Sequence, residues 1–129
     1  KSNECVVEKA LDLVQTGLAR RDPALLGKGA TLSALANQKI LPKPRLEELI
    51  AFSARHGAYG VNVAHSGTVA GVLLPPGWER DRPFARNLRQ HFPEIKNCCP
   101  LRLVGGGPRY PGMIWRKEEG YRAETPAWR

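Results

Sequence analysis

The segment from Gly57 to Gly71 concentrates the residues of this chain that could do chemistry. It reads GAYGVNVAHSGTVAG, in which small and hydroxyl-bearing residues interrupt apolar ones. Its glycines would let a ligand or a second backbone come close, and the Ser66 and Thr68 hydroxyls can donate hydrogen bonds. Backbone N–H groups in such a turn can also face an anion. A plain hairpin whose glycines only permit the turn accounts for the same composition, so both interpretations stay open.

Two familiar catalytic motifs do not fit the chain. Gly27-Lys28 has the glycine–lysine pair of a P-loop, but Asp22 stands where its first glycine belongs and no Ser or Thr follows the lysine. His65 and Ser66 are neighbours without a Gly-x-Ser-x-Gly turn, which argues against a Ser-His triad. The chemistry of this segment therefore has to come from another arrangement.

The cysteines and the apolar runs limit the class of protein. Cys5, Cys98 and Cys99 are odd in number and two of them are adjacent, which fits neither a disulfide framework nor a zinc site. The longest apolar run, around Val69–Leu74, is far shorter than the roughly 20 residues that span a bilayer. We expect reduced thiols in a cytoplasmic protein, with no metal site and no membrane partner.

A longer series of motifs resembles the C-terminal domain of the GHMP kinase superfamily, over about residues 5–105. The series consists of LLG at 25–27, LSALAN at 32–37, the segment 44–56, GAYG at 57–60 and SG at 66–67. The run AHSGTV at 64–69, with Asn62 before it, is most similar to the L-threonine kinases of cobalamin synthesis and propanediol utilisation. Two extra residues between Gly60 and Ser66 favour this branch, while Thr68-Val69 replaces the small pair that is usual in the superfamily.

The resemblance implies one half of a two-domain kinase. Such an enzyme transfers the γ-phosphoryl group of ATP, with Mg²⁺, to the hydroxyl of a small molecule, here L-threonine. The N-terminal domain of these kinases carries the Gly/Ser-rich phosphate motif and the acid that assists the hydroxyl, and neither occurs in this chain. We expect ATP and Mg²⁺ to be bound mainly by that domain, which is the expected partner. The chain by itself should hold no catalytic residue and be inactive.

The start of the chain agrees with this expectation. It begins at Lys1 without a signal-peptide pattern, and its only methionine is Met113. We expect a processed, cut or partial protein.

The same resemblance implies which residues of this chain reach the cleft. The cofactor side is expected to be lined by His65, Ser66, Gly67 and Thr68. The substrate side is expected to include Asn62, together with Ser33 and Asn37, one turn apart on a helix face. An exposed or helix-packing role explains Ser33 and Asn37 equally well.

Hydrophobic spacing predicts the helices that position these residues. The first is expected over 4–20, and the second from Pro23 to before Pro42, with Asp22 as its N-cap. The third is expected from Pro44 to Ala54, with Gly57 as its C-terminal glycine. A fourth starts at Asp81 or Pro83 and carries Phe84, Leu88 and Phe92 on one face.

Strands are expected at 59–64, at 68–74 and at Leu101–Val104. The order α-α-α-β-β-α-β predicts an α+β fold with a small antiparallel or mixed sheet covered by helices. The resemblance implies the ferredoxin-like form of the kinase domain. We place this domain at 1–108 and a basic, aromatic-containing tail without regular periodicity at 109–129. Three strands make a thin sheet, so a further strand from the tail or from additional chain is expected.

The charge leaves other functions open. Twenty Lys and Arg against 12 Asp and Glu give a formal net charge of +8, which attracts polyanions. The alternative is a non-enzymatic nucleic-acid-binding module that uses Arg102, Arg109, Tyr110, Trp115 and Arg116. A third interpretation is an interaction domain, and a fragment that exposes the face meant for its N-terminal half should self-associate.

Overall fold

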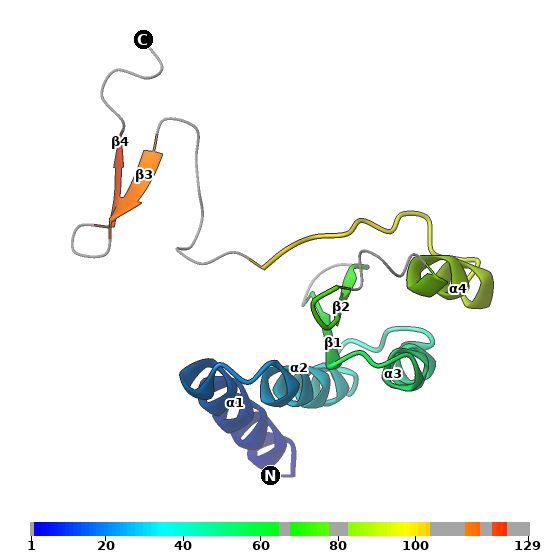
Figure 1. Cartoon of the computed structure of the whole chain (residues 1–129). Helices are drawn as coiled ribbons and strands as arrows, with labels where there is room; N and C mark the ends of the chain where they lie inside the picture. Colours follow the sequence, from blue (N-terminus) through cyan, green and yellow to red (C-terminus); the bar gives the residue numbers. More distant parts are fainter. Residues whose placement is uncertain (1, 65–67, 78–82, 104–112, 117–119, 124–129) are drawn as a thin grey trace. The chain divides into compact units, whose positions relative to one another are not determined.

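The computed structural model describes residues 2–64, 68–77, 83–103, 113–116 and 120–123 (Figure 1). These residues fall into two compact units, Lys1–Cys98 and Cys99–Arg129. Unit 1 contains four helices and a two-stranded antiparallel sheet among its described residues, which confirms the predicted α+β class. Within the described part of the chain, no helix is both long enough and apolar enough to cross a membrane.

The first two helices form a hairpin. α1 covers Ser2–Arg20 and α2 covers Pro23–Asn37, and the two lie side by side in Figure 1. Asp22 is the N-cap of α2: its Oδ1 accepts hydrogen bonds from the backbone N–H of Ala24 at 2.9 Å and of Leu25 at 3.2 Å. Because this cap satisfies N–H groups that the first helical turn leaves free, α2 begins where the sequence predicts.

The third helix, α3, covers Leu46–Arg55 and ends as predicted. His56 is its C-cap, and Gly57 follows with a φ of 82°. A residue with a side chain is strained in this left-handed conformation, so glycine is the fitting residue there.

The sheet of unit 1 packs directly on α2. β1 (Gly60–Val63) pairs antiparallel with β2 (Ala70–Leu73), and Val61 lies opposite Val72. The outer edge of β1 is held by α2, since the Val61 N–H donates to Thr31 Oγ1 at 3.0 Å. A Cβ on Gly60 would overlap the carbonyl oxygen of Gly27, so the two backbones touch here. This contact fixes how closely α2 lies against β1.

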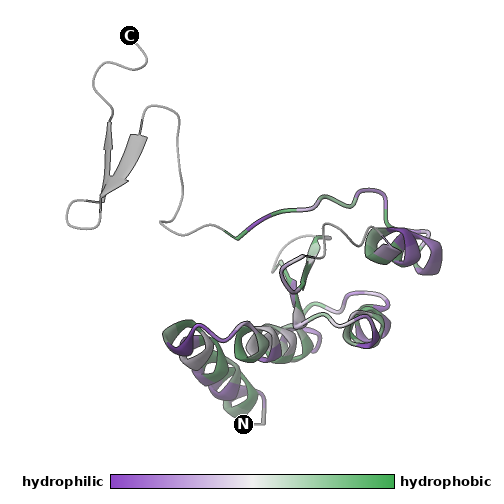
Figure 2. Cartoon of the chain, viewed as in Figure 1, coloured by the Kyte–Doolittle hydropathy of each residue, from purple (hydrophilic) through white to green (hydrophobic). Residues whose placement is uncertain are grey.

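Two apolar clusters form the core of unit 1. The first contains Ala34, Leu46 and Val61, and joins α2, α3 and β1. The second contains Phe52, Leu88 and Phe92, and joins α3 to α4 (Pro83–His91). Leu49 of α3 packs against both clusters. Figure 2 shows hydrophobic and hydrophilic residues on α4, which agrees with its one buried face.

The predicted strand at Leu101–Val104 was wrong. Residues 101–103 form no strand, and Leu101 and Leu103 are 84% and 88% exposed, while Val104 lies outside the described residues. Alternating apolar residues become a strand only when a neighbouring strand takes up their backbone hydrogen bonds.

The expectation of an irregular tail was also wrong. In unit 2, β3 (Met113–Arg116) and β4 (Gly120–Ala123) form an antiparallel pair in which Trp115 lies opposite Tyr121. The further strand expected from the tail therefore exists, but it pairs within the tail and the sheet of unit 1 keeps two strands in the described structure. β3 reads MIWR and β4 reads GYRA, and neither alternates strictly between apolar and polar residues.

Candidate functional site

The hairpin of β1 and β2 carries the segment that the sequence singles out. The Ala64 N–H donates to the Val69 carbonyl at 3.1 Å, so the two strands stay joined up to the connection 65–68. His65, Ser66 and Gly67 lie outside the described residues. Thr68 is exposed in the bend before β2.

Asn62 lies on the face of the hairpin opposite the core. Val61 is 1% exposed and points into the core, so its neighbour Asn62, which is exposed, points to the other side of the strand. Asn62 stands directly opposite Gly71 in the register, and its Oδ1 occupies the space where a Gly71 side chain would begin. The Asn62 carboxamide therefore lies across β2 and offers a donor and an acceptor at the surface.

Ser33 and Asn37 occupy different surroundings on α2. Thr31 faces β1, and Ser33 is two residues further, or about 200° around a helix, so it points away from the hairpin and is exposed. Asn37 is half-buried, and its Nδ2 has no hydrogen-bond partner among the described residues. No hydrogen bond in the described structure joins either side chain to Asn62 or Thr68.

Two residues that matter for the hairpin escaped sequence reasoning. Thr31 holds the backbone of β1, and Gly71 makes room for Asn62. The small residue opposite Asn62 could have been found by pairing the two predicted strands around the connection. The Thr31 contact joins residues 30 positions apart and leaves no pattern in the sequence.

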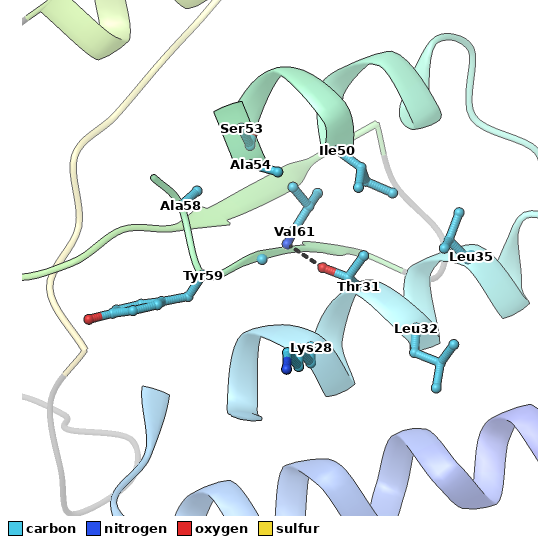
Figure 3. Close-up of a pocket in the computed structure, with 11 residues that line it drawn as sticks. Lys28, Thr31, Leu32, Leu35, Ile50, Ser53, Ala54, Ala58, Tyr59 and Val61 are labelled. Atoms are coloured by element: carbon cyan, nitrogen blue, oxygen red, sulfur yellow. Dashed lines mark hydrogen bonds between the residues drawn. The ribbon is translucent and has the colours of Figure 1, made fainter. Parts of the chain in front are cut away.

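A pocket of about 280 Å³ lies between α2, α3 and β1. Figure 3 shows Lys28 and Thr31 on α2 and Ile50 and Ser53 on α3, with Val61 of β1 between the two helices. Most of the lining is apolar. Ser53 is the exception at depth: it is 1% exposed, and its hydroxyl has no hydrogen-bond partner in the described part of the chain.

A charged cluster sits at the junction of α3 and α4. Arg45 pairs with Glu48 at 2.9 Å and with Glu94 at 2.7 Å. The hydrogen bond from Arg45 lowers the pKa of Glu48. The pKa of Glu94 is lowered by its own backbone N–H and then by Arg45. Arg45 also lies over the Phe92 ring, 4.5 Å from its centre, so this cluster ties the segment after α4 to the start of α3.

The described residues contain no group of three or more His, Cys, Asp or Glu side chains that could hold a metal ion. Among the described residues of the hairpin, the Thr68 hydroxyl and the Asn62 carboxamide are side-chain donors. These neutral groups suit hydrogen bonds to a phosphate or to a polar substrate.

The chain is similar to a known family and to two named kinases. The family description "GHMP kinases C terminal" matches residues 14–94. The chain is 42% identical over 116 residues to a protein of Citrobacter freundii named L-threonine kinase, covering 83% of this chain and 38% of the relative. It is 41% identical over 111 residues to the L-threonine kinase of Salmonella typhimurium strain LT2, covering 82% and 36%. The chain thus spans little more than a third of the length of these relatives, and no solved structure matches it.

Proposed function

The chain belongs to the GHMP kinase family as a C-terminal domain, and on this premise we propose that it is part of an ATP-dependent kinase that phosphorylates the hydroxyl of L-threonine. The observation that carries the proposal is the identity of 42% to an L-threonine kinase across 83% of the chain. We further propose that this reaction serves cobalamin synthesis, in connection with propanediol utilisation. We also propose that the protein is cytoplasmic.

The hairpin connection contributes to the cleft in this proposal. Phosphoryl transfer depends on positioning and on stabilising charge at the transferred group, so neutral hydrogen-bond donors on a fixed hairpin are useful there. Thr68, with His65, Ser66 and Gly67, is proposed to face the phosphates of ATP. Asn62 is proposed to face the substrate, and its exposed carboxamide next to Gly71 supports that role.

Ser33 and Asn37 are also proposed as substrate contacts. The Asn37 Nδ2 is buried without a hydrogen-bond partner among the described residues, so a polar group that reached it would complete its hydrogen bonding. The exposed side of α2 on which Ser33 lies does not face the hairpin. A substrate that touches Asn37 would have to approach the C-terminal end of α2.

ATP and Mg²⁺ are proposed to be held mainly by an N-terminal kinase domain. The described residues supply hydroxyl and amide groups suited to phosphate oxygens, but no carboxylate cluster of the kind that binds Mg²⁺. The metal, when bound, would neutralise charge on the phosphates. Contact with that domain is supported by α1, on which Val7, Leu11 and Leu18 are each more than half exposed.

An assay of ATP-dependent phosphorylation tests the proposed division of the active site between this chain and an N-terminal domain. We expect no L-threonine phosphate from the 129-residue chain alone, because it holds only part of the site. We expect activity from a chimera in which this chain replaces the matching segment of the C. freundii L-threonine kinase. Robust activity of the chain alone would overturn the division, and a chimera that is folded but inactive would overturn the proposed function.

Substitutions in the hairpin connection test its role within that chimera. Ser66→Ala and His65→Ala are each expected to lower kcat/KM about tenfold or more, because a hydrogen bond to a charged group contributes about 1.5–3 kcal/mol. Gln90→Ala, at an exposed position of α4, is the control and should leave kcat/KM unchanged. Wild-type kinetics in both hairpin variants would mean that the connection serves the fold alone.

A further inference from the structure

The pocket between α2, α3 and β1 lies on the other side of the sheet from the proposed catalytic face. Val61 lines the pocket, and its strand neighbour Asn62 is exposed on the opposite face. Successive side chains of a strand point to opposite faces, so a molecule in this pocket cannot be the one that Asn62 would contact. A ligand of this pocket would therefore differ from the substrate proposed for Asn62.

Small residues keep the pocket open. Ala54, Ala58 and Gly60 form part of its wall, while longer apolar side chains such as Leu35 and Ile50 form the rest. Its volume is about 280 Å³. An apolar cavity of about 150 Å³ already accommodates a benzene ring, so this pocket has room for a ring with a short substituent.

Thr31 and Tyr59 also line the pocket, but Ser53 and Lys28 are the polar lining residues that differ most in exposure. The Ser53 hydroxyl is buried without a hydrogen-bond partner among the described residues, at a cost of about 1–3 kcal/mol for a hydroxyl left unpaired. Lys28 lines the same pocket from α2 and is exposed, and no described carboxylate forms an ion pair with it. The depth of the pocket is therefore apolar, and the exposed Lys28 ammonium at its edge would attract an anion.

The geometry points to a binding site for a small monocarboxylic acid with an apolar ring or branched chain. The apolar body would fill the space beside Leu35 and Ile50, and the carboxylate would reach the Lys28 ammonium. The Val61 N–H is bound to Thr31, and β1 continues from Val61 to the hairpin connection. Such a ligand would therefore contact the strand that carries the proposed catalytic face.

The probe for this site is 3-phenylpropionate, titrated into the isotope-labelled 129-residue chain by NMR. We expect the amide signals of Ser53, Tyr59 and Val61 to shift together, with a Kd in the millimolar range, since drug-like ligands gain about 0.3 kcal/mol for each non-hydrogen atom. The neutral amide of the same acid should bind about fivefold more weakly, because it lacks the charge that attracts Lys28.

Three variants make the outcome decisive. Lys28→Met should reduce the affinity for the acid to that for the amide, while Lys9→Met, at an exposed position of α1, should leave it unchanged. Ala54→Leu narrows the pocket from an exposed helix position at which leucine is well tolerated, so it should abolish binding in a folded chain. Absence of shifts, shifts that map elsewhere, equal binding of acid and amide, or full binding by Ala54→Leu would each overturn the proposal.

Discussion

At the scale of single residues, the contact between Gly27 and Gly60 sets the distance between α2 and the sheet. The clash that a side chain at position 60 would make is with a backbone carbonyl, which cannot turn aside as a side chain can. Gly57 differs, because its positive φ of 82° is unfavourable for a side chain although the space around it is open. The two glycines are therefore needed for different physical reasons.

A pair of alanine substitutions separates these reasons. Gly60→Ala is expected to lower the free energy of unfolding by about 3 kcal/mol, because α2 must move away from β1. Gly57→Ala is expected to lower the free energy of unfolding by only about 1 kcal/mol, because alanine is unfavourable in the left-handed conformation. Urea unfolding followed by circular dichroism measures both. An equal or smaller loss for Gly60→Ala would contradict the backbone contact.

At the scale of elements, Arg45 connects the start of α3 with the end of α4. It has a left-handed backbone with φ of 59°, and its guanidinium donates to Glu48, to Glu94 and, at 3.3 Å, to the His91 carbonyl. The pKa of Arg45 is raised, first by its hydrogen bond to Glu48. One cation thus holds together groups that lie more than 40 residues apart in the sequence.

The pH dependence of stability follows from the lowered pKa values of Glu48 and Glu94. Both have an ordinary pKa of 4.5 and a lower one in the folded chain. Their contribution to stability is therefore present above pH 4.5 and is lost as the pH falls through the folded values. In Arg45→Met the Glu48 pKa should return toward 4.5 and acid unfolding should become less steep in this range.

An NMR titration of the glutamate side chains measures these values directly. Arg55→Met, in the last turn of α3, is the matched control and should leave the Glu48 pKa where it is in the unsubstituted chain. A Glu48 pKa that stays low in Arg45→Met would show that another group causes the shift.

At the scale of the whole molecule, the chain divides between Cys98 and Cys99, and we expect unit 1 to fold without unit 2. Unit 1 contains both core clusters and all four described helices. Cys98 packs against the second cluster, so a truncation should keep it. Residues 1–98 alone are expected to have the same free energy of unfolding in urea as the 129-residue chain, within about 0.5 kcal/mol. A clearly lower midpoint would mean that unit 2 supports unit 1.

Local chemistry explains which elements were predictable from sequence. Asp22 before Pro23 and Gly57 after α3 act through their own backbone neighbours, so their patterns are visible in the chain itself. The strand pairing of unit 2 was missed, and a strand was wrongly expected at Leu101–Val104, because pairing depends on a distant partner.

The candidate site was predictable only in part for the same reason. The motif that contains Asn62 and Thr68 is contiguous in sequence, and it led to the hairpin and to the family. The Gly71 contact depends on strand register, and the pocket around Ser53 depends on three elements that come together in space. Neither leaves a spacing that a single sequence displays.

Leu49 couples the unfolding of the two core clusters of unit 1. Since it touches the cluster of α2 and β1 as well as the aromatic cluster under α4, neither cluster can lose its packing without exposing part of the other. Unit 1 should therefore behave as one cooperative block, in which the slowest-exchanging amides of α2 and of α4 open together. Leu49→Ala would uncouple them and let α4 exchange its amide hydrogens well before α2.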